Sequence, residues 1–285
     1  MISNISKVLV LLLIISPSLC LLPGKYFDHF FLIIFENQGY SDVTQNQDFM
    51  NYAQQGYLLT NFYAQTHPSQ PNYITILAGD PMGVADDSVH DVDGTNIIDL
   101  IEAKGVSWKS YNEGYPGGCF TGSKSGLYAR KHTPFISFLD IQNDAERCAK
   151  IVEASQLDSD LQNLDTLPQF MFYTPNLNDD GHNTDLDTAG QFLSSFFGER
   201  LNKFPENTLI VITWDEGEGD DYDSNHIYTA LLGSMVPAGG QDDANYGFPS
   251  ITHLVEENWD LGNLGRSDAD APIMFPIKNA QFLRK

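Results

Sequence analysis

Three apolar segments without charged residues stand out along the chain: Phe30 to Phe35, Phe170 to Thr174 and Leu209 to Trp214. Continuous apolar runs are typical of strands buried on both faces of a sheet, although a buried helix segment has the same pattern. Between them, Thr95 to Lys104 and Asp187 to Asn202 carry apolar residues at helical spacing. Because strands alternate with helices, the pattern predicts an α/β fold with a mainly parallel central sheet and helices on both faces.

The first 20 residues have a pattern of charge and hydrophobicity that differs from the rest of the chain. Lys7 precedes the apolar run Val8 to Ile15, and small residues follow up to Cys20. This layout predicts a secretory signal peptide over residues 1–20. The alternative is a membrane anchor, but the run is shorter than the roughly 18 apolar residues that a span needs. We therefore expect no membrane span, and a protein that is secreted or delivered to a lysosome-like compartment.

The mature chain is expected to form one domain. Its composition is 42% hydrophobic and 12% aromatic, as in globular proteins, and no internal repeat or Gly/Ser/Pro-rich linker interrupts it. This favours a single domain over residues 21–285. Of the 3 cysteines, Cys119 and Cys148 remain after removal of Cys20. An even pair in an oxidising compartment predicts a Cys119–Cys148 disulfide, with two unpaired buried thiols as the alternative.

The chain is strongly acidic. It has 15 Lys+Arg against 38 Asp+Glu, a net charge of −23 and a pI near 4.3. This argues against nucleic acid as a partner, and phosphate chemistry would need a cation. The low pI favours an acidic working pH, because repulsion among carboxylates falls toward pH 5, where histidine is mostly protonated.

Oxygen-bearing side chains directly follow the three apolar segments. Glu36 and Asn37 follow the first, Asp215 and Glu216 follow the last, and a polar stretch from Asn176 to His182 follows the middle one. Ligands bind beyond the carboxyl ends of strands in α/β sheets, so these oxygens are expected to form a site for one hard divalent cation, with Ca²⁺, Mg²⁺ or Mn²⁺ favoured over Zn²⁺. The alternative is that they mark where strands meet water.

Ser69 opens a segment that reads as the start of a helix. One interpretation is that its hydroxyl caps the helix. The other is that Ser69 is a nucleophile, because the free amides at a helix N-terminus stabilise a phosphoryl group delivered there. A neutral serine is a weak nucleophile, so a metal would have to lower the pKa of its hydroxyl.

Two further charged segments have open interpretations. The acidic segment from Asp86 to Asp93, which includes Asp87, lacks the spacing of a helix-loop-helix calcium motif and is expected to be a solvated loop. Lys124, Arg130 and Lys131 form a basic cluster near the predicted disulfide. Contact with a substrate phosphate and simple solvent exposure are both open for this cluster.

Five motifs carry a family resemblance: FENQGY, HPSQPNY, TPNLNDDGH, ITWDEGEGDDYDSNH and ENWDLGNLGRSDADA. In order and spacing they resemble the secreted phosphoesterase family, which includes acid phosphatases and non-specific phospholipases C and has an alkaline-phosphatase-like fold. The resemblance covers nearly the whole mature chain. WKSYNEGYPGGCF and the later Cys148 are closer to the short acid phosphatases than to the long phospholipases.

The resemblance also implies roles for individual residues. It makes Ser69 the nucleophile that becomes phosphorylated, and it places the metal against the Ser69 oxygen, held by Glu36, Asn37, Asp215 and Glu216. Beside the phosphoryl group it places Asp180, His182 as the acid for the leaving alcohol, Asn72 on a phosphate oxygen, and His226 as a further neighbour. It also brings the segment of His132 to the site, where His132 is either a site residue or a packing residue.

These observations predict a secreted metal-dependent acid phosphatase that hydrolyses small phosphate monoesters through a phosphoserine. One alternative is a phospholipase C or other phosphodiesterase that uses the same residues. An alternative of another class is a non-catalytic secreted protein that binds metal or phosphate.

Overall fold

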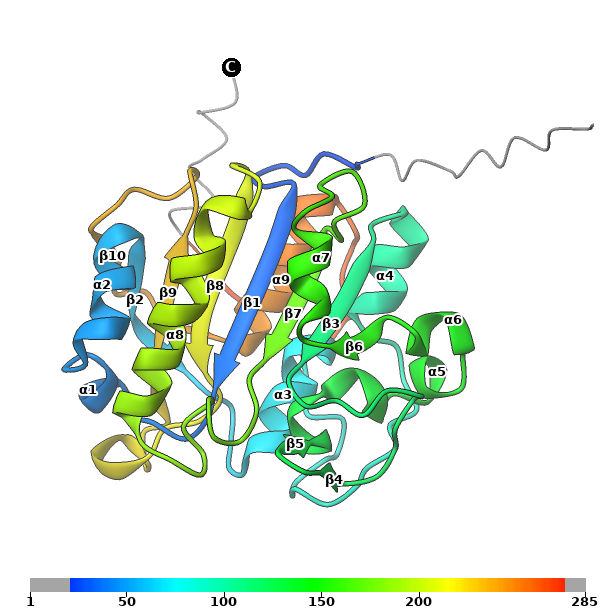
Figure 1. The fold of residues 1–285 in the computed structure, drawn as a ribbon, viewed down its shortest axis with the longest axis horizontal. Coiled ribbons are helices and arrows are strands. Elements are labelled where there is room, and N and C mark those ends of the chain that lie inside the picture. The colour runs from blue at the N-terminus through cyan, green and yellow to red at the C-terminus, as the bar shows by residue number, and fades with distance from the viewer. Residues whose placement is uncertain (1–20, 275–285) are drawn as a thin grey trace, which may run out of the picture.

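The computed structural model describes residues 21–274 (Figure 1). The predicted signal peptide, residues 1–20, lies outside the described residues. A central sheet has the strand order β10-β2-β9-β8-β1-β7-β3-β6, with β11 paired to β2. Its strands are β1 (His29–Phe35), β2 (Tyr57–Tyr63), β3 (Trp108–Asn112), β6 (Ile151–Glu153), β7 (Phe170–Thr174), β8 (Thr208–Trp214), β9 (His226–Leu232), β10 (Gly240–Asp242) and β11 (Tyr246–Gly247). A separate hairpin is formed by β4 (Lys124–Ser125) and β5 (Tyr128–Ala129).

The centre of the sheet is parallel, as the apolar runs predict. Strand β1 lies between β7 and β8, with Phe30 in register with Phe170 on one side and Leu209 on the other. All seven residues of β1 and all seven of β8 are buried, which explains why neither strand alternates polar and apolar residues. Within the described residues, β9 alone runs antiparallel to its neighbours β8 and β2.

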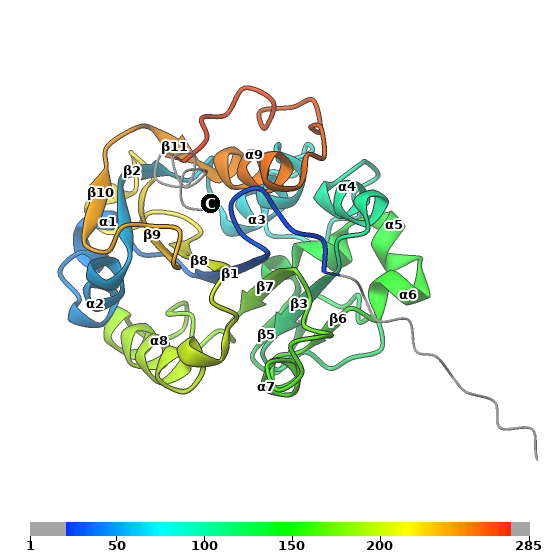
Figure 2. The same ribbon diagram turned by 90° about the horizontal axis from the view of Figure 1, so that it is seen from above.

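Helices cover both faces of the sheet (Figure 2). One face carries α2 (Gln47–Gln55), α7 (Gln156–Asp160) and α8 (Leu186–Arg200), and the other carries α3 (Ser69–Ala78), α4 (Ile97–Lys104) and α9 (Phe248–Trp259). The short helices are α1 (Tyr40–Val43), α5 (Leu139–Gln142) and α6 (Ala145–Cys148), and the 3₁₀ turns are η1 (Arg130–His132), η2 (Pro134–Ser137), η3 (Leu201–Lys203) and η4 (Gly219–Asp221). The predicted fold class is therefore confirmed.

The two predicted helices form with small shifts at their ends. Helix α4 begins two residues after Thr95, because Asn96 caps it in a reciprocal capping box with Asp99. It ends at Gly105, whose φ of 88° is in the left-handed region that favours glycine. Helix α8 begins at Leu186 after the capping residue Asp185 and passes into η3 beyond Arg200.

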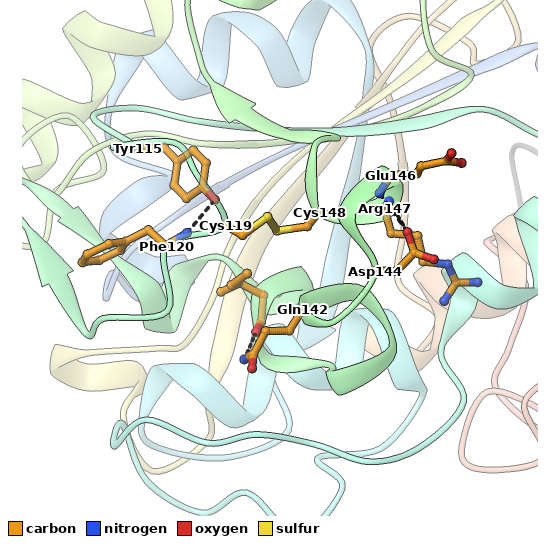
Figure 3. The surroundings of a disulfide bond; sticks show 9 residues. Tyr115, Cys119, Phe120, Gln142, Asp144, Glu146, Arg147 and Cys148 are labelled. Carbon is orange, nitrogen blue, oxygen red and sulfur yellow. Dashed lines mark hydrogen bonds between the residues drawn. A yellow bond between two sulfur atoms is a disulfide. The ribbon is translucent and has the colours of Figure 1, made fainter.

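A disulfide joins Cys119 to Cys148, as predicted (Figure 3). It links the loop that follows β3 to the end of α6, and Tyr115 holds the same loop by accepting a hydrogen bond from the Phe120 amide, 3.1 Å long.

Between residues 21 and 274, no helix is long and apolar enough to cross a membrane.

Candidate functional site

The predicted site residues after β1, β7 and β8 meet at the carboxyl edge of the sheet. The Glu36 amide donates to the Asp180 carbonyl at 3.0 Å, which ties the residues after β1 to those after β7. The Asn37 amide donates to Asp215 Oδ1 at 2.9 Å, which ties β1 to β8 in the same way. Because the three strands are adjacent and parallel, Asn37 and Asp215 become neighbours although they are 178 positions apart along the chain.

Ser69 lies within this cluster. It is the first residue of α3, follows the N-cap Pro68 and is fully buried. Its hydroxyl is placed to donate to Glu36 Oε2 at 3.1 Å and to Glu216 Oε1 at 3.0 Å. The capping interpretation is therefore wrong: this helix start has no side-chain cap among the described residues, and the Ser69 hydroxyl faces the carboxylates instead.

Asn72 shapes the turn that carries Ser69. Its Oδ1 accepts hydrogen bonds from the amides of Gln65 and Thr66, at 3.0 and 3.1 Å. Its Nδ2 donates to the Thr66 carbonyl at 2.7 Å. Asn72 thus braces the chain between β2 and α3, and the structure places it behind the Ser69 turn rather than on the Ser69 hydroxyl.

The carboxylates around Ser69 are buried close together, and neighbouring positive groups do not balance all of their negative charge. Burial raises the pKa of Asp215 well above its usual value, and Glu36 and Glu216 raise it further. Burial likewise raises the pKa of Glu216, although a hydrogen bond from His67 opposes the change. Asp215 Oδ2 and Asn37 Oδ1 are buried without a hydrogen-bond partner among residues 21–274. Unpaired oxygens next to repelling carboxylates fit a divalent cation.

The same side chains do not form a closed metal cage. In the described part of the chain, no three His, Cys, Asp or Glu side chains converge as a preformed ligand set. The residues thus fit a hard cation by charge and oxygen chemistry, and its coordination would require small side-chain movements.

His132 is at the centre of the cluster rather than in general packing. Its ring is 2% exposed, with Nε2 2.9 Å from Glu36 Oε1 and Nδ1 3.5 Å from Asp180 Oδ2. Burial opposes protonation, but Glu36 and Asp180 prevail and raise the pKa of His132 to about 9. Tyr73 stacks on the ring at 5.2 Å and donates its hydroxyl hydrogen bond to Glu36 at 2.8 Å.

The positively charged side chain of Lys131 lies next to Ser69. Its Nζ is 3.3 Å from Ser69 Oγ, 3.5 Å from His182 Nε2 and 2.9 Å from Asp87 Oδ2. The other carboxylate oxygen of Asp87 accepts the backbone hydrogen bond of Gln70 at 3.0 Å. The expectation of a purely solvated acidic loop is thus wrong for Asp87, because it anchors both Lys131 and the first turn of α3.

His182 lies beside this pair, as the resemblance implies. Its amide donates to Asp180 Oδ1 at 2.8 Å, which fixes the turn after β7. Its ring centroid is 6.0 Å from that of His132, and its exposed Nδ1 lies 3.2 Å from Asn183 Oδ1. His182 therefore faces the open side of the site, and His132 its buried side.

Two other histidines lie near the site: His67 was given no role from the sequence, and His226 was expected beside the phosphoryl group. His67 Nδ1 pairs with Glu216, and its ring stacks on Tyr222 at 4.1 Å. His67 begins the HPSQPNY motif, which is the only sequence signal that could have identified it. His226 instead stacks between Tyr40 and Tyr63, at 4.1 and 4.9 Å, and bonds to the Thr60 carbonyl. The structure therefore places His226 in a packing position beside β2, away from Ser69.

A sequence model of the phosphoesterase family matches residues 28–262. The chain belongs to this family. It is 36% identical to a probable acid phosphatase of Kluyveromyces lactis over 90% of the chain and 64% of the relative. It is 37% identical to an acid phosphatase of Aspergillus niger over 87% of the chain and 62% of the relative. The chain thus spans a little over three fifths of these relatives.

Other comparisons extend the family assignment. A phosphatidylinositol-3-phosphatase of Mycobacterium tuberculosis is 26% identical over 87% of the chain and 82% of its own length. Among solved structures, a protein in the alkaline phosphatase superfamily from Vibrio parahaemolyticus superposes with a TM-score of 0.61 at 13% identity, over 88% of this chain and 72% of that one. The alkaline-phosphatase-like fold is therefore confirmed.

Proposed function

We propose that this phosphoesterase is a secreted, metal-dependent acid phosphatase that hydrolyses small phosphate monoesters through a phosphoserine. One observation carries the proposal: the Ser69 hydroxyl lies at the start of α3, between Glu36 and Glu216 and beside the Lys131 ammonium. The buried charges around this hydroxyl are costly to maintain, and such clusters are concentrated at functional sites. The acid phosphatase relatives and the acidic charge balance support the acid working range.

In the proposed reaction a divalent cation, when bound, would lower the pKa of the Ser69 hydroxyl. Glu36, Asn37, Asp215 and Glu216 would hold it. Ser69 gives its proton to a solvent water and its oxygen bonds to phosphorus, while the bond from phosphorus to the ester oxygen breaks. His182 donates a proton to that oxygen, so the alcohol leaves neutral.

Water completes the cycle. It attacks the phosphoserine and returns a proton to His182, the bond from phosphorus to the Ser69 oxygen breaks, and that oxygen takes a proton back from solvent as phosphate leaves. Asp180 keeps His182 in place through the backbone hydrogen bond of 2.8 Å. The positive end of the α3 dipole lies at Ser69 and would stabilise the negative charge of the transferred group.

Secretion is part of the same proposal. It is supported by the leader-like residues 1–20 and by the disulfide between Cys119 and Cys148. Stable disulfides are found in proteins of oxidising compartments.

The test is hydrolysis of a simple aryl phosphate by the purified mature chain from about pH 4 to 9. We expect an acid optimum, loss of turnover in Ser69→Ala, and unchanged turnover in the control Ser234→Ala, whose hydroxyl donates to the Glu206 carbonyl at the opposite edge of the sheet. Chelation should abolish turnover, and addition of Mg²⁺, Ca²⁺, Mn²⁺ or Zn²⁺ should identify the ion that restores it. Turnover of a diaryl phosphate alone would establish the phosphodiesterase, and turnover of neither ester would establish the non-catalytic alternative.

A further inference from the structure

A cavity of about 360 Å³ opens beside Ser69, between the loop of Asp87 and the β4–β5 hairpin. Figure 1 shows this hairpin near α3, at the end of the sheet toward which β1 points. The cavity is lined by Gln70, Asp87, Lys131 and His182, together with the basic residues Lys124 and Arg130 and with small or apolar residues. It is larger than the cavity of about 140 Å³ lined by Asn37, Pro68 and Glu216, so we take it as the path of a substrate to Ser69.

Lys131 is held in one position within this cavity. Its side chain is only 17% exposed, and its ion pair with Asp87 is 2.9 Å long. Asp87 is itself fixed by the backbone of Gln70, next to Ser69 in α3. The ammonium is thus preorganised 3.3 Å from the hydroxyl, so it needs little rearrangement to meet an anionic oxygen there.

Gln70 supplies a second hydrogen-bond donor beside Lys131, and this donor has no acceptor within the described residues. Its side chain is 2% exposed and lines the cavity, and its Nε2 has no hydrogen-bond partner within residues 21–274. A buried amide donor without an acceptor costs about 1–3 kcal/mol, so such a group in a native protein points to a missing acceptor. The acceptor would lie in the same cavity as Lys131 Nζ.

We propose that Lys131, assisted by Gln70, binds the third terminal oxygen of a phosphate monoester and thereby makes the enzyme select monoesters over diesters. This inference rests on the proposed function, because it concerns the same phosphoryl site. A monoester presents three terminal oxygens, and all of them share the negative charge. A diester replaces one of them with an alkoxy oxygen, which is an uncharged, poor acceptor and carries a second organic group.

The selectivity follows from the cost of unpaired donors. A charge-assisted hydrogen bond from an ammonium to a phosphate oxygen is among the stronger polar contacts in proteins. A site built to donate hydrogen bonds rejects an analogue without the acceptor, because its own donors are then left buried and unpaired. A diester would leave Gln70 Nε2 unpaired and would offer Lys131 no anionic oxygen in addition to Asp87.

The test compares binding of methyl phosphate and dimethyl phosphate by titration calorimetry, in the non-reacting Ser69→Ala background with excess Mg²⁺ or Ca²⁺. We expect Lys131→Met to weaken methyl phosphate about 30-fold and dimethyl phosphate less than about 3-fold. Lys131→Arg should retain much of the difference between the two ligands. The matched control is Lys109→Met, which removes a similarly shielded lysine of β3 that pairs with Asp160 at 2.6 Å, and it should alter neither affinity.

Steady-state kinetics of the parent and Lys131→Met on aryl and diaryl phosphate separate this inference from the proposed function. A fall in the monoester-to-diester ratio of kcat/KM, with an unchanged circular dichroism spectrum, supports it. Equal losses for both ligands, or no loss for either, overturn it even when monoester turnover upholds the proposed function. Conversely, selective loss of methyl phosphate binding in a protein without turnover would keep Lys131 as the selectivity residue and reject the phosphatase.

Discussion

His132 and Glu36 form a buried ion pair, with Nε2 2.9 Å from Oε1 and both side chains at most 2% exposed. His132 lies in η1 and Glu36 directly after β1, so the pair joins the loop layer to the centre of the sheet. The positive charge of His132 lies among the carboxylates that surround Ser69. His132 lowers the pKa of Glu36 against the opposing effect of burial, and so keeps Glu36 ionised.

Replacement of His132 by leucine should destabilise the protein strongly. The variant leaves Glu36 and Asp180 buried without their cation, and breaking a buried pair in this way costs about 3–5 kcal/mol. Urea denaturation measures the loss. His90→Leu is the control, because His90 pairs with the exposed Asp86 and its loss should change stability little. Equal, small losses in the two variants would show that His132 is not the balancing charge.

Asp215→Asn should have opposite effects without and with a divalent cation. In a chelated sample the variant should be more stable by about 1 kcal/mol, because one of three mutually repelling buried carboxylates is gone. With added cation the parent should gain melting temperature and the variant much less. Asp223→Asn, in the exposed loop that follows, is the control and should behave like the parent. A parent that gains nothing from any cation would remove the metal site from the proposal.

Removal of the disulfide should lower stability without touching the chemistry. Cys119 and Cys148 are separated by 29 residues, and a loop of this size contributes about 3 kcal/mol through the entropy of the unfolded chain. The double variant Cys119→Ala/Cys148→Ala should lose this amount in chemical denaturation under oxidising conditions. Under a reductant strong enough to open the bond, parent and variant should unfold together. A difference that persists after reduction would assign the loss to side-chain packing instead.

The core of the site could be predicted because its residues follow long apolar strands. Continuous burial of β1, β7 and β8 leaves a clear pattern, and parallel neighbours must present their ends at one edge, so Glu36, Asp215 and Asp180 meet. Lys131, Asp87 and His67 come instead from a 3₁₀ turn and from loops. Such segments have no periodicity, and their positions depend on tertiary contacts that only the folded chain shows.

The short strands at the edge of the sheet also could not be predicted from sequence patterns. Strands β10 and β11 are three and two residues long, too short for any alternation to appear. His226 illustrates the consequence. It opens β9, the antiparallel strand, and pairs in register with Tyr63 of β2, so its ring packs against tyrosines instead of facing Ser69.

A buried carboxyl pair far from Ser69 should make the protein more stable in acid than at neutral pH. Glu256 of α9 is 1% exposed and Asp268 is fully buried, and the Leu264 amide donates to both, at 3.1 and 2.8 Å. Glu256 Oε2 has no hydrogen-bond partner in the described residues. Burial, and then the charge of Asp268, raise the pKa of Glu256 to about 8.

The direction of the pH effect follows from this raised pKa. Below the unfolded value of about 4.5, Glu256 is protonated in both states and costs nothing. As the pH rises toward 8, the unfolded chain releases the proton while the folded chain retains it, so the free energy of unfolding falls. Glu256→Gln keeps the shape without the proton, so it should match the parent near pH 4 and exceed it by about 2 kcal/mol near pH 8.

Urea denaturation of the parent and of Glu256→Gln at about pH 4, 6 and 8 measures the divergence. The exposed Glu206→Gln serves as the control and should follow the parent at every pH. Parallel curves for the parent and Glu256→Gln would mean that the folded protein ionises Glu256 at no cost, and the acid stability would then have to arise from the carboxylates around Ser69. Divergence in chelated samples as well would place the effect at Glu256, because the metal ligands lie in another part of the fold.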